Sequence, residues 1–217
     1  MVEDTGSDSW RAGSEEAERF VDSSLADFAA ACADASGGPA AGSGSAAAGA
    51  IGAALVSMAL RCAAGERRGA DPEDAPREAP YLLGRADEVD ALRTQLVDLV
   101  DEDHRVYAEW RRLEAANAPE DKRAKAREAV LETPFEILER AVFALRLAAV
   151  SADSVPDPWA AELRTGAALL QGAHMGARAV FEANLDAFEI PDADARRAEL
   201  GVLAGAAHEA LSALGLG

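Results

Sequence analysis

AGSGSAAAGAIGAALVSM, residues 41–58, predicts a helix built almost wholly of Gly, Ala and Ser and entered through a small-residue turn. Glycines at a helix entrance allow backbone geometries closed to other residues, and the free N–H groups of the first turn can face an anion or a partner backbone. Another helix or a flat ligand can approach such a helix closely, and composition alone favours the helix contact. The segment is not a phosphate-binding loop, because it lacks the Lys-Ser/Thr ending and a preceding strand.

The rest of the chain has the composition of an all-α protein. Its 217 residues are 49% hydrophobic, mostly Ala and Leu, with 5% aromatics, which favours helix over strand. After a frayed segment at 1–13, residues 14–217 are predicted to form a single domain, an antiparallel bundle of about seven helices. We expect helices from residue 14 with a break near Ser23-Ser24, and then over about 44–65, 84–116, 120–132, 134–152, 159–188 and 192–214.

Two of these helices, 44–65 and 159–188, are too rich in Ala and Gly to fill a core by side-chain volume. They must cross other helices closely, and a bundle built in this way often completes itself in a dimer. We therefore expect a homodimer.

The charge balance is strongly acidic: 39 Asp and Glu against 21 Lys and Arg give a net charge of −18. Such a surface repels nucleic acid and anionic membranes, so neither is an expected partner. A halophilic source is one hypothesis for this pattern, and high-GC codon bias is the other. We expect the chain to lack a positively charged, apolar leader, and we expect no uncharged run as long as a membrane span. The sequence therefore predicts a soluble cytoplasmic protein. Cys32 and Cys62 form no disulfide framework or metal site and are predicted to be buried.

Some polar residues fall inside the apolar pattern. Asp103 lies on or beside the stripe that faces the core, where a carboxylate is costly unless it is hydrogen-bonded or serves a site. Glu162 is a similar case, and the two could share proton transfer if the fold brings them together. Asn184 lies deep in an apolar helix, where an interhelical hydrogen bond is the simplest explanation. His104, His174 and His208 are too isolated to share a metal, so no metal site is predicted.

Several motifs occur in an order and spacing that are specific as a set. They are SLADF (24–28), AGSGSAA (41–47), GAAL (52–55) followed by Met58 and Gly65, LVDLVDED (96–103) with Tyr107, Pro134, Gly176-Ala177 and Asn184-Leu185.

Over about residues 24–214 the chain resembles the cyclodeaminase/cyclohydrolase family, which includes the C-terminal domain of formiminotransferase-cyclodeaminase and free-standing methenyltetrahydrofolate cyclohydrolases. The resemblance implies an all-helical homodimer with no prosthetic group that acts on tetrahydrofolate one-carbon derivatives. An enzyme of this family either expels ammonia from 5-formiminotetrahydrofolate to close the methenyl ring or opens that ring with water. For this chemistry we expect Asp103 and Glu162 as catalytic residues, and as substrate-binding residues Gly42, Ser43, Gly44, Ser45, Tyr107, Arg178 and Asn184.

The departures from the family pattern cluster at polar positions. Val180 and Arg61 stand where the family has Asn, Ala63 where it has Thr, and Ser43 replaces a glycine, while the Pro-Lys after the long helix has no clear counterpart. The alternative hypothesis is therefore a non-catalytic helical dimer of the same fold that binds a ligand or a protein partner.

Overall fold

The computed structural model describes residues 19–66, 76–188, 190 and 192–217, and all regular structure in these ranges is helical. The all-α prediction is confirmed, with six α-helices in the described ranges rather than about seven. Their bounds are α1 Leu25–Ala33, α2 Ala41–Ala63, α3 Ala79–Ala115, α4 Glu120–Ser151, α5 Asp157–Ala187 and α6 Ala193–Ala213, with short 3-10 helices η1 at Phe20–Asp22 and η3 at Ala152–Ser154. The predicted frayed segment 1–13 lies outside the described residues.

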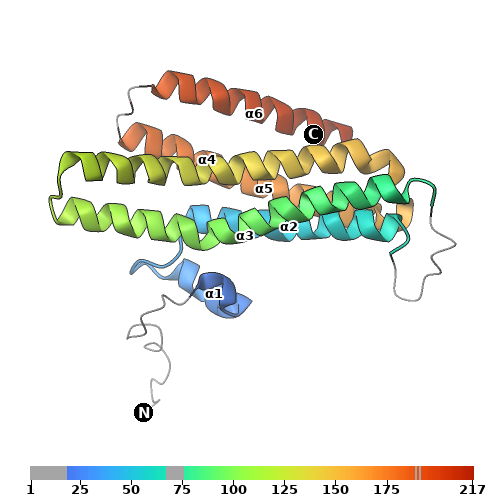
Figure 1. Ribbon diagram of the computed structural model, residues 1–217, viewed down its shortest axis with the longest axis horizontal. Coiled ribbons are helices and arrows are strands. Elements are labelled where there is room, and N and C mark those ends of the chain that lie inside the picture. The colour runs from blue at the N-terminus through green and yellow to red at the C-terminus, as the bar shows by residue number, and fades with distance from the viewer. Residues whose placement is uncertain (1–18, 67–75, 189, 191) are drawn as a thin grey trace, which may run out of the picture.

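The long helices lie side by side in one elongated bundle (Figure 1). The small-residue helix α2 packs mainly against α3 and α5, α4 packs against both of these, and α6 lies on α4. The expectation that no uncharged run reaches the length of a membrane span is wrong, because α2 is long and apolar enough to cross one; 56% of its most apolar window is buried inside the bundle. Burial of this kind is typical of the core helix of a bundle. The first helix, α1, has no buried residue and projects from the bundle.

Glycines set the spacing between α2 and α5. A Cβ at Gly52 would lie 2.7 Å from the Gly166 carbonyl oxygen, and a Cβ at Gly166 would lie 2.6 Å from the Gly52 oxygen. Farther along, a Cβ at Gly176 would lie 2.3 Å from Ser45 Oγ. The two helices run antiparallel, because Gly52 lies against Gly166 and the earlier Ser45 lies against the later Gly176. The close crossing expected of two Ala/Gly-rich helices is therefore made within one chain.

The predicted break before Pro134 is wrong, because α4 runs through it from Glu120 to Ser151. A proline has no N–H, so it frees the carbonyl four residues earlier, at Val130. That carbonyl accepts a hydrogen bond of 3.0 Å from Asn184 Nδ2 on α5. The side chain of Asn184 replaces the missing ladder bond and lets the helix continue, which makes two expected helices one.

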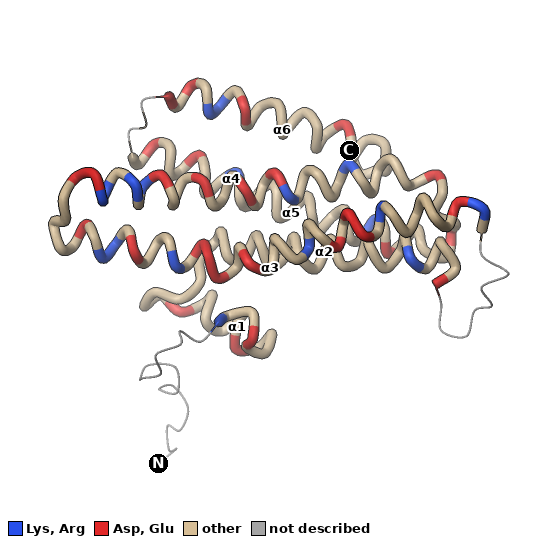
Figure 2. Tube along the Cα trace, in the orientation of Figure 1, with Lys and Arg blue, Asp and Glu red and all other residues tan. Residues whose placement is uncertain are grey.

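Other expectations are corrected in detail. The break at Ser23-Ser24 is confirmed, since α1 begins after Ser24, whose side chain caps Asp27 N at 3.1 Å. Cys32 is exposed and Cys62 half-buried, so the prediction of two buried cysteines is wrong. Cys32 is exposed because α1 has no buried residue and contacts the core only through partly buried Phe28. In Figure 2, charged residues are spread along every long helix except α2, whose first charged residue is Arg61.

Candidate functional site

Asp103 is a buried carboxylate on α3 that meets the first turn of α2. It is 9% exposed, and its Oδ2 accepts hydrogen bonds from Ser43 N at 2.9 Å and from Ser43 Oγ at 3.0 Å. The N-cap of α2, Ala40, has no side chain able to cap the helix. Asp103 therefore supplies from a neighbouring helix the acceptor that a free helix N-terminus needs, where its negative charge is also favoured.

Gly42 makes this approach possible. A Cβ at that position would lie 2.0 Å from Asp103 Oδ1 and 2.4 Å from its Cγ, so no other residue fits there without moving the carboxylate. The small-residue entrance to α2 thus accommodates a side chain of this protein rather than an external anion.

Burial dominates the electrostatics of this carboxyl. Desolvation raises the pKa of Asp103 above the ordinary Asp value, and the two hydrogen bonds from Ser43, with the nearby His104, oppose part of that rise. A carboxyl with a raised pKa holds and releases a proton closer to neutral pH than an exposed one, which is what proton transfer requires.

The other residues expected around the entrance of α2 lie at the same end of the bundle. Ser45 Oγ donates to the Ala41 carbonyl at 2.7 Å and contacts the Gly176 backbone position on α5. Gly44 has nothing within 4 Å of where its Cβ would be, so its side of α2 is open. Arg178, one half-turn beyond Gly176, pairs with Glu182 at 3.0 Å and is exposed.

Tyr107 lies one turn beyond Asp103 on α3 and is 43% exposed. Its ring packs on Trp110 at 5.3 Å between centroids, and Trp110 packs on Phe188 at 5.2 Å. These three rings form an aromatic cluster that begins one turn beyond Asp103 on α3.

Two expected site residues lie elsewhere. Asn184 bonds the Val130 carbonyl, so its amide is used inside the fold. Glu162 lies one helical turn before Gly166, which contacts Val56. Val56 lies 13 residues, or about 20 Å, beyond Ser43 along α2, and Glu162 lies about one turn farther on, so the two carboxylates are about 25 Å apart along this axis. One chain therefore does not bring Asp103 and Glu162 together, although Glu162 Oε2 is buried without a hydrogen-bond partner among the described residues.

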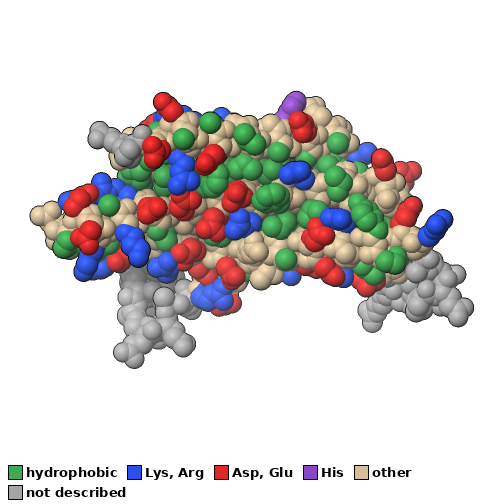
Figure 3. Space-filling model, turned by 45° about the horizontal axis from the view of Figure 1, so that its top comes forward, with side chains coloured by type: hydrophobic (Ala, Val, Ile, Leu, Met, Phe, Trp, Pro, Cys, Tyr) green, Lys and Arg blue, Asp and Glu red, His purple; other side chains and the backbone are tan. Residues whose placement is uncertain are grey.

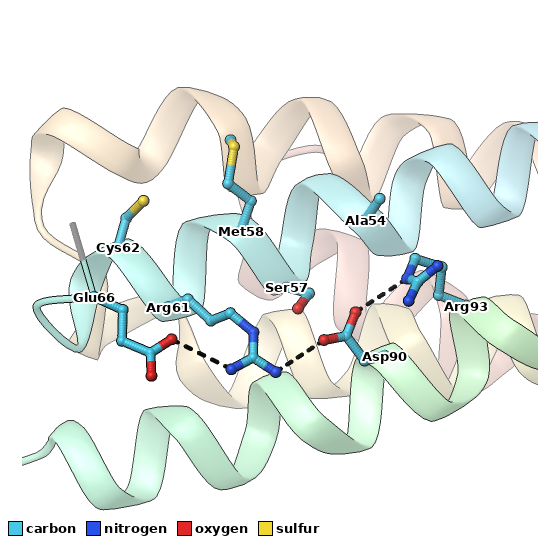
Figure 4. Close-up of a pocket in the computed structure, with 8 residues that line it drawn as sticks. All are labelled: Ala54, Ser57, Met58, Arg61, Cys62, Glu66, Asp90 and Arg93. Carbon is cyan, nitrogen blue, oxygen red and sulfur yellow. Dashed lines mark hydrogen bonds and ion pairs between the residues drawn. The ribbon is translucent and has the colours of Figure 1, made fainter. Parts of the chain in front are cut away.

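The sequence reasoning missed a pocket at the other end of α2 (Figure 4). It has a volume of about 350 Å³ and is lined by Ala54, Ser57, Met58, Arg61, Cys62, Glu66, Asp90 and Arg93. Arg61 bonds Asp90 at 2.9 Å, Asp87 at 2.6 Å and Glu66 at 3.3 Å. Its charge is thus compensated by acidic side chains. The departure of Arg61 from the family pattern was the available signal for this site.

In the described part of the chain no three His, Cys, Asp or Glu side chains gather as a metal site.

Comparison with known proteins gives a consistent picture. Residues 24–199 match the sequence profile of the formiminotransferase-cyclodeaminase family. No curated protein matches the chain. The crystal structure of formiminotetrahydrofolate cyclodeaminase from Thermotoga maritima superposes with a TM-score of 0.75 at 17% sequence identity, over 89% of this chain and 94% of that one. The fold is shared at low identity, and the match over 24–199 shows that this chain belongs to the formiminotransferase-cyclodeaminase family.

Proposed function

We propose that this protein is a cytoplasmic folate one-carbon enzyme, either a formiminotetrahydrofolate cyclodeaminase or a methenyltetrahydrofolate cyclohydrolase. The observation that carries the proposal is the Asp103 carboxylate. It is buried, it has a raised pKa, and it is held at the entrance of α2 beside the open surface at Gly44. The N-terminus of α2 favours a negative charge, but an amide could accept the same two bonds without the cost of burying an ionisable group, and a role in proton transfer accounts for that cost.

The reaction suits a single carboxyl group. In ring closure, N10 of 5-formiminotetrahydrofolate attacks the formimino carbon, and N10 loses its proton. The bond from that carbon to the amine nitrogen then breaks, and the nitrogen takes one proton and leaves as ammonia. Asp103 can carry the proton from N10 to the departing amine, so that the protonation state of the enzyme is restored.

Charge also favours a carboxylate here. The formimino group is cationic when protonated, and the methenyl product is a cation, so the reacting carbon carries positive charge at both ends of the step. A fixed negative charge in a site of low dielectric stabilises that charge more than water does. In the cyclohydrolase direction, water adds to the same cationic carbon and gives its proton to the carboxylate.

The anionic glutamate tail of a folate needs a local positive group, because the protein as a whole carries a charge of −18. Arg178 is exposed at the same end of the bundle, where it pairs only with its helix neighbour Glu182 in the described structure. An exposed pair of this kind contributes little, so the tail carboxylate can replace Glu182. Arg178 is therefore our candidate for the tail.

A non-catalytic role is the second candidate, and two observations favour it. Val180, half-buried on α5 between Gly176 and Asn184, leaves an apolar side chain where the family pattern has an amide. The amide that remains, Asn184, is occupied by the Val130 carbonyl. A site built for two hydrogen bonds loses much of its affinity when one donor is absent.

Activity and binding assays separate the two candidates. We expect purified protein to release ammonia from 5-formiminotetrahydrofolate, or to consume 5,10-methenyltetrahydrofolate, as followed by the absorbance of the methenyl group. Because of Val180 we expect dissociation constants above about 1 μM by calorimetry, with tighter binding after Val180→Asn. Binding without turnover in both proteins supports the non-catalytic role. Absence of folate binding as well as turnover refutes the enzyme and leaves the non-catalytic role, with a different ligand or a protein partner.

A further inference from the structure

A short N-terminal segment, Arg19 with η1, lies on the turn of α3 that carries Asp103. It precedes the residues that match the family, which begin at residue 24. The backbone N–H of Phe20 donates to Asp101 Oδ1 at 2.7 Å, and Arg19 Nε donates to Asp101 Oδ2 at 3.1 Å. Asp101 is two residues before Asp103 on α3. The residue that anchors η1 and the candidate catalytic group therefore belong to one helical turn.

Aromatic side chains continue this contact. The centroid of the Phe20 ring lies 5.0 Å from that of His104, edge to face, and 6.4 Å from that of Phe28 on α1. Phe20, Val21 and Phe28 are half-buried and pack against the hydrophobic core. These three side chains therefore cover the bundle beside Asp103, although most of α1 is exposed.

Asp103 needs shielding from water that the neighbouring part of α2 does not supply. Residues 41–50 of α2 are all Gly, Ala or Ser, whose small side chains cover little of a carboxylate. Burial is nevertheless the main cause of the raised pKa of Asp103. Part of the shielding therefore has to come from larger side chains on other elements, and Phe20 is placed for this role against His104, the next residue after Asp103.

We infer that Asp101 is a positioning residue of the candidate site: it fixes η1 on α3, and η1 then keeps water away from the turn that carries Asp103. Asp101 does not touch the substrate in this scheme and acts only through Asp103. The shielding itself is independent of any activity, and its effect on turnover rests on the proposed function.

Two carboxylates contact Arg19, and only one of them holds η1. The Asp98 carboxylate lies 3.6 Å from Arg19 and its side chain is 70% exposed, so this ion pair contributes little. The Asp101 side chain is 23% exposed and also accepts the backbone N–H of Phe20, a charge-assisted hydrogen bond. Asp98 is therefore a matched control for Asp101 on the same face of α3.

The charges near this turn do not explain its shielding. The elements packed against α3 are α2, α4 and η1, and α2 has no charged residue before Arg61. The charged groups on η1, on α4 at this level and on α3 itself are Arg19 and Asp22, Glu132 with its partner Arg196, and Glu102 with Arg105 beside His104. Replacing Phe20 changes none of these charges. A His104→Gln background removes the imidazole that Phe20 contacts, so a shift in the titration of Asp103 there reports water access.

Hydrogen exchange of the Ser43 N–H measures this access without any folate, because that N–H donates to Asp103 Oδ2. We expect it to exchange at least about tenfold faster in Asp101→Ala and in Phe20→Ala than in the wild type. Both changes release the same segment, so the double variant should match the faster single one. Asp101→Asn keeps an oxygen for the Phe20 N–H and should restore slow exchange.

Two control variants should exchange like the wild type. Asp98→Ala removes only the long contact with Arg19. Val202→Ala shortens an exposed side chain on α6, where apolar side chains form a band with α4 that charged side chains interrupt (Figure 3). Since η1 and α1 have no buried residue, all these variants should keep the wild-type circular dichroism spectrum.

The titration of Asp103 gives the second measurement. Carbon-13 NMR of the Asp carboxyl groups, with the Asp103 signal identified by its absence from Asp103→Asn, should show Asp103 titrating at a lower pH in Phe20→Ala, closer to the ordinary Asp value. The more hydrated carboxylate is a weaker base. The acid limb of turnover on 5-formiminotetrahydrofolate should therefore move to lower pH, and kcat at neutral pH should fall with KM unchanged.

The outcomes separate the inference from the proposed function. Unchanged exchange of the Ser43 N–H in Asp101→Ala and Phe20→Ala, or equal acceleration in Asp98→Ala, overturns the inference. Faster exchange with an unmoved pH profile, or with no turnover by any of the proteins, refutes the catalytic role of Asp103 and supports the shielding by η1. Altered turnover without faster exchange refutes the shielding alone.

Discussion

Replacing Gly52 with alanine tests how tightly α2 and α5 are packed. In a helix interior this change is normally favourable by about 0.5–1 kcal/mol, because glycine loses more backbone entropy on folding. Here the new methyl carbon lies 2.7 Å from the Gly166 carbonyl oxygen and 3.0 Å from both Leu170 N and Leu170 Cγ, whereas ordinary contacts begin at 3.4 Å. Two of these atoms belong to the backbone of α5, so the whole helix must move.

The crossing therefore has to open by about 0.7 Å at its closest point. Overpacking of a core costs about 1–3 kcal/mol, and a contact with backbone lies at the upper end of that range. After the gain in helix propensity we expect a net loss of about 1–2 kcal/mol, and a midpoint of thermal unfolding lower by about 2–8 °C for a chain of this length. Gly52→Leu is expected to be worse.

Circular dichroism during thermal and urea unfolding measures the effect, and Gly201→Ala on α6 is the matched control because nothing lies within 4 Å of its new Cβ. We expect that control to gain about 0.5–1 kcal/mol. Gly166→Ala strains the same contact, so its cost and that of Gly52→Ala are expected not to add. A Gly52→Ala protein as stable as the control would refute the tight crossing.

Single contacts and the net charge lead to three further predictions. Asn184→Ala leaves the Val130 carbonyl without its donor and is expected to lower the free energy of unfolding by about 1–3 kcal/mol. The loss should be smaller in a Pro134→Ala background, where residue 134 regains an N–H for that carbonyl, and equal losses in a double-mutant cycle would contradict this. Burial, and then the charge of Arg178, lowers the pKa of His174 below its ordinary value. As the pH drops through about 6.5, His174 therefore takes up a proton in the unfolded chain before it does so in the folded one, and the free energy of unfolding should fall. His174→Leu should show a smaller fall in urea titrations, and an unchanged one would exclude His174 as the cause. The net charge of −18 predicts an unfolding temperature that rises steeply with KCl, and a protein equally stable in dilute buffer would refute a halophilic adaptation.

Much of the fold could be predicted from the sequence because its signals are local. Ala and Leu content, apolar spacing and the Gly-Pro punctuation predict helices, and the residues 24–28, 41–58 and 96–103 predict the family. The continuous α4 could not be predicted, because Pro134 is a helix breaker unless something supplies the lost bond. That donor, Asn184, follows Pro134 by 50 residues in the sequence and lies beside α4 only in the folded chain.

In the candidate site, too, local signals could be read from the sequence and contacts between helices could not. Asp103 could be singled out because a carboxylate on an apolar stripe is costly wherever the fold places it. Its partner could not be deduced, since pairing depends on how helices align. Glu162, the expected partner, lies at the far end of α2, and Ser43 takes the contact instead. The pocket at Arg61 was missed because its lining residues come from two helices and a loop end.

The most direct test of the central claim is the turnover of Asp103→Asn on 5-formiminotetrahydrofolate and 5,10-methenyltetrahydrofolate, beside Asp98→Asn as control. Asp98 is an exposed carboxylate on the same helix, paired with Arg19 at 3.6 Å. The amide introduced by Asp103→Asn can still accept hydrogen bonds from Ser43 but cannot carry a proton, so we expect turnover to fall by roughly two orders of magnitude, while Asp98→Asn keeps wild-type turnover.

The unfolding free energy of Asp103→Asn at neutral pH should be unchanged or higher. A raised Asp pKa means that wild-type stability falls as the pH rises from the ordinary Asp value through the raised one, and the amide removes that fall. Lost turnover with retained stability is the predicted result. Full turnover, or a large loss of stability together with lost turnover, would show that Asp103 is a structural cap and contradict its catalytic role.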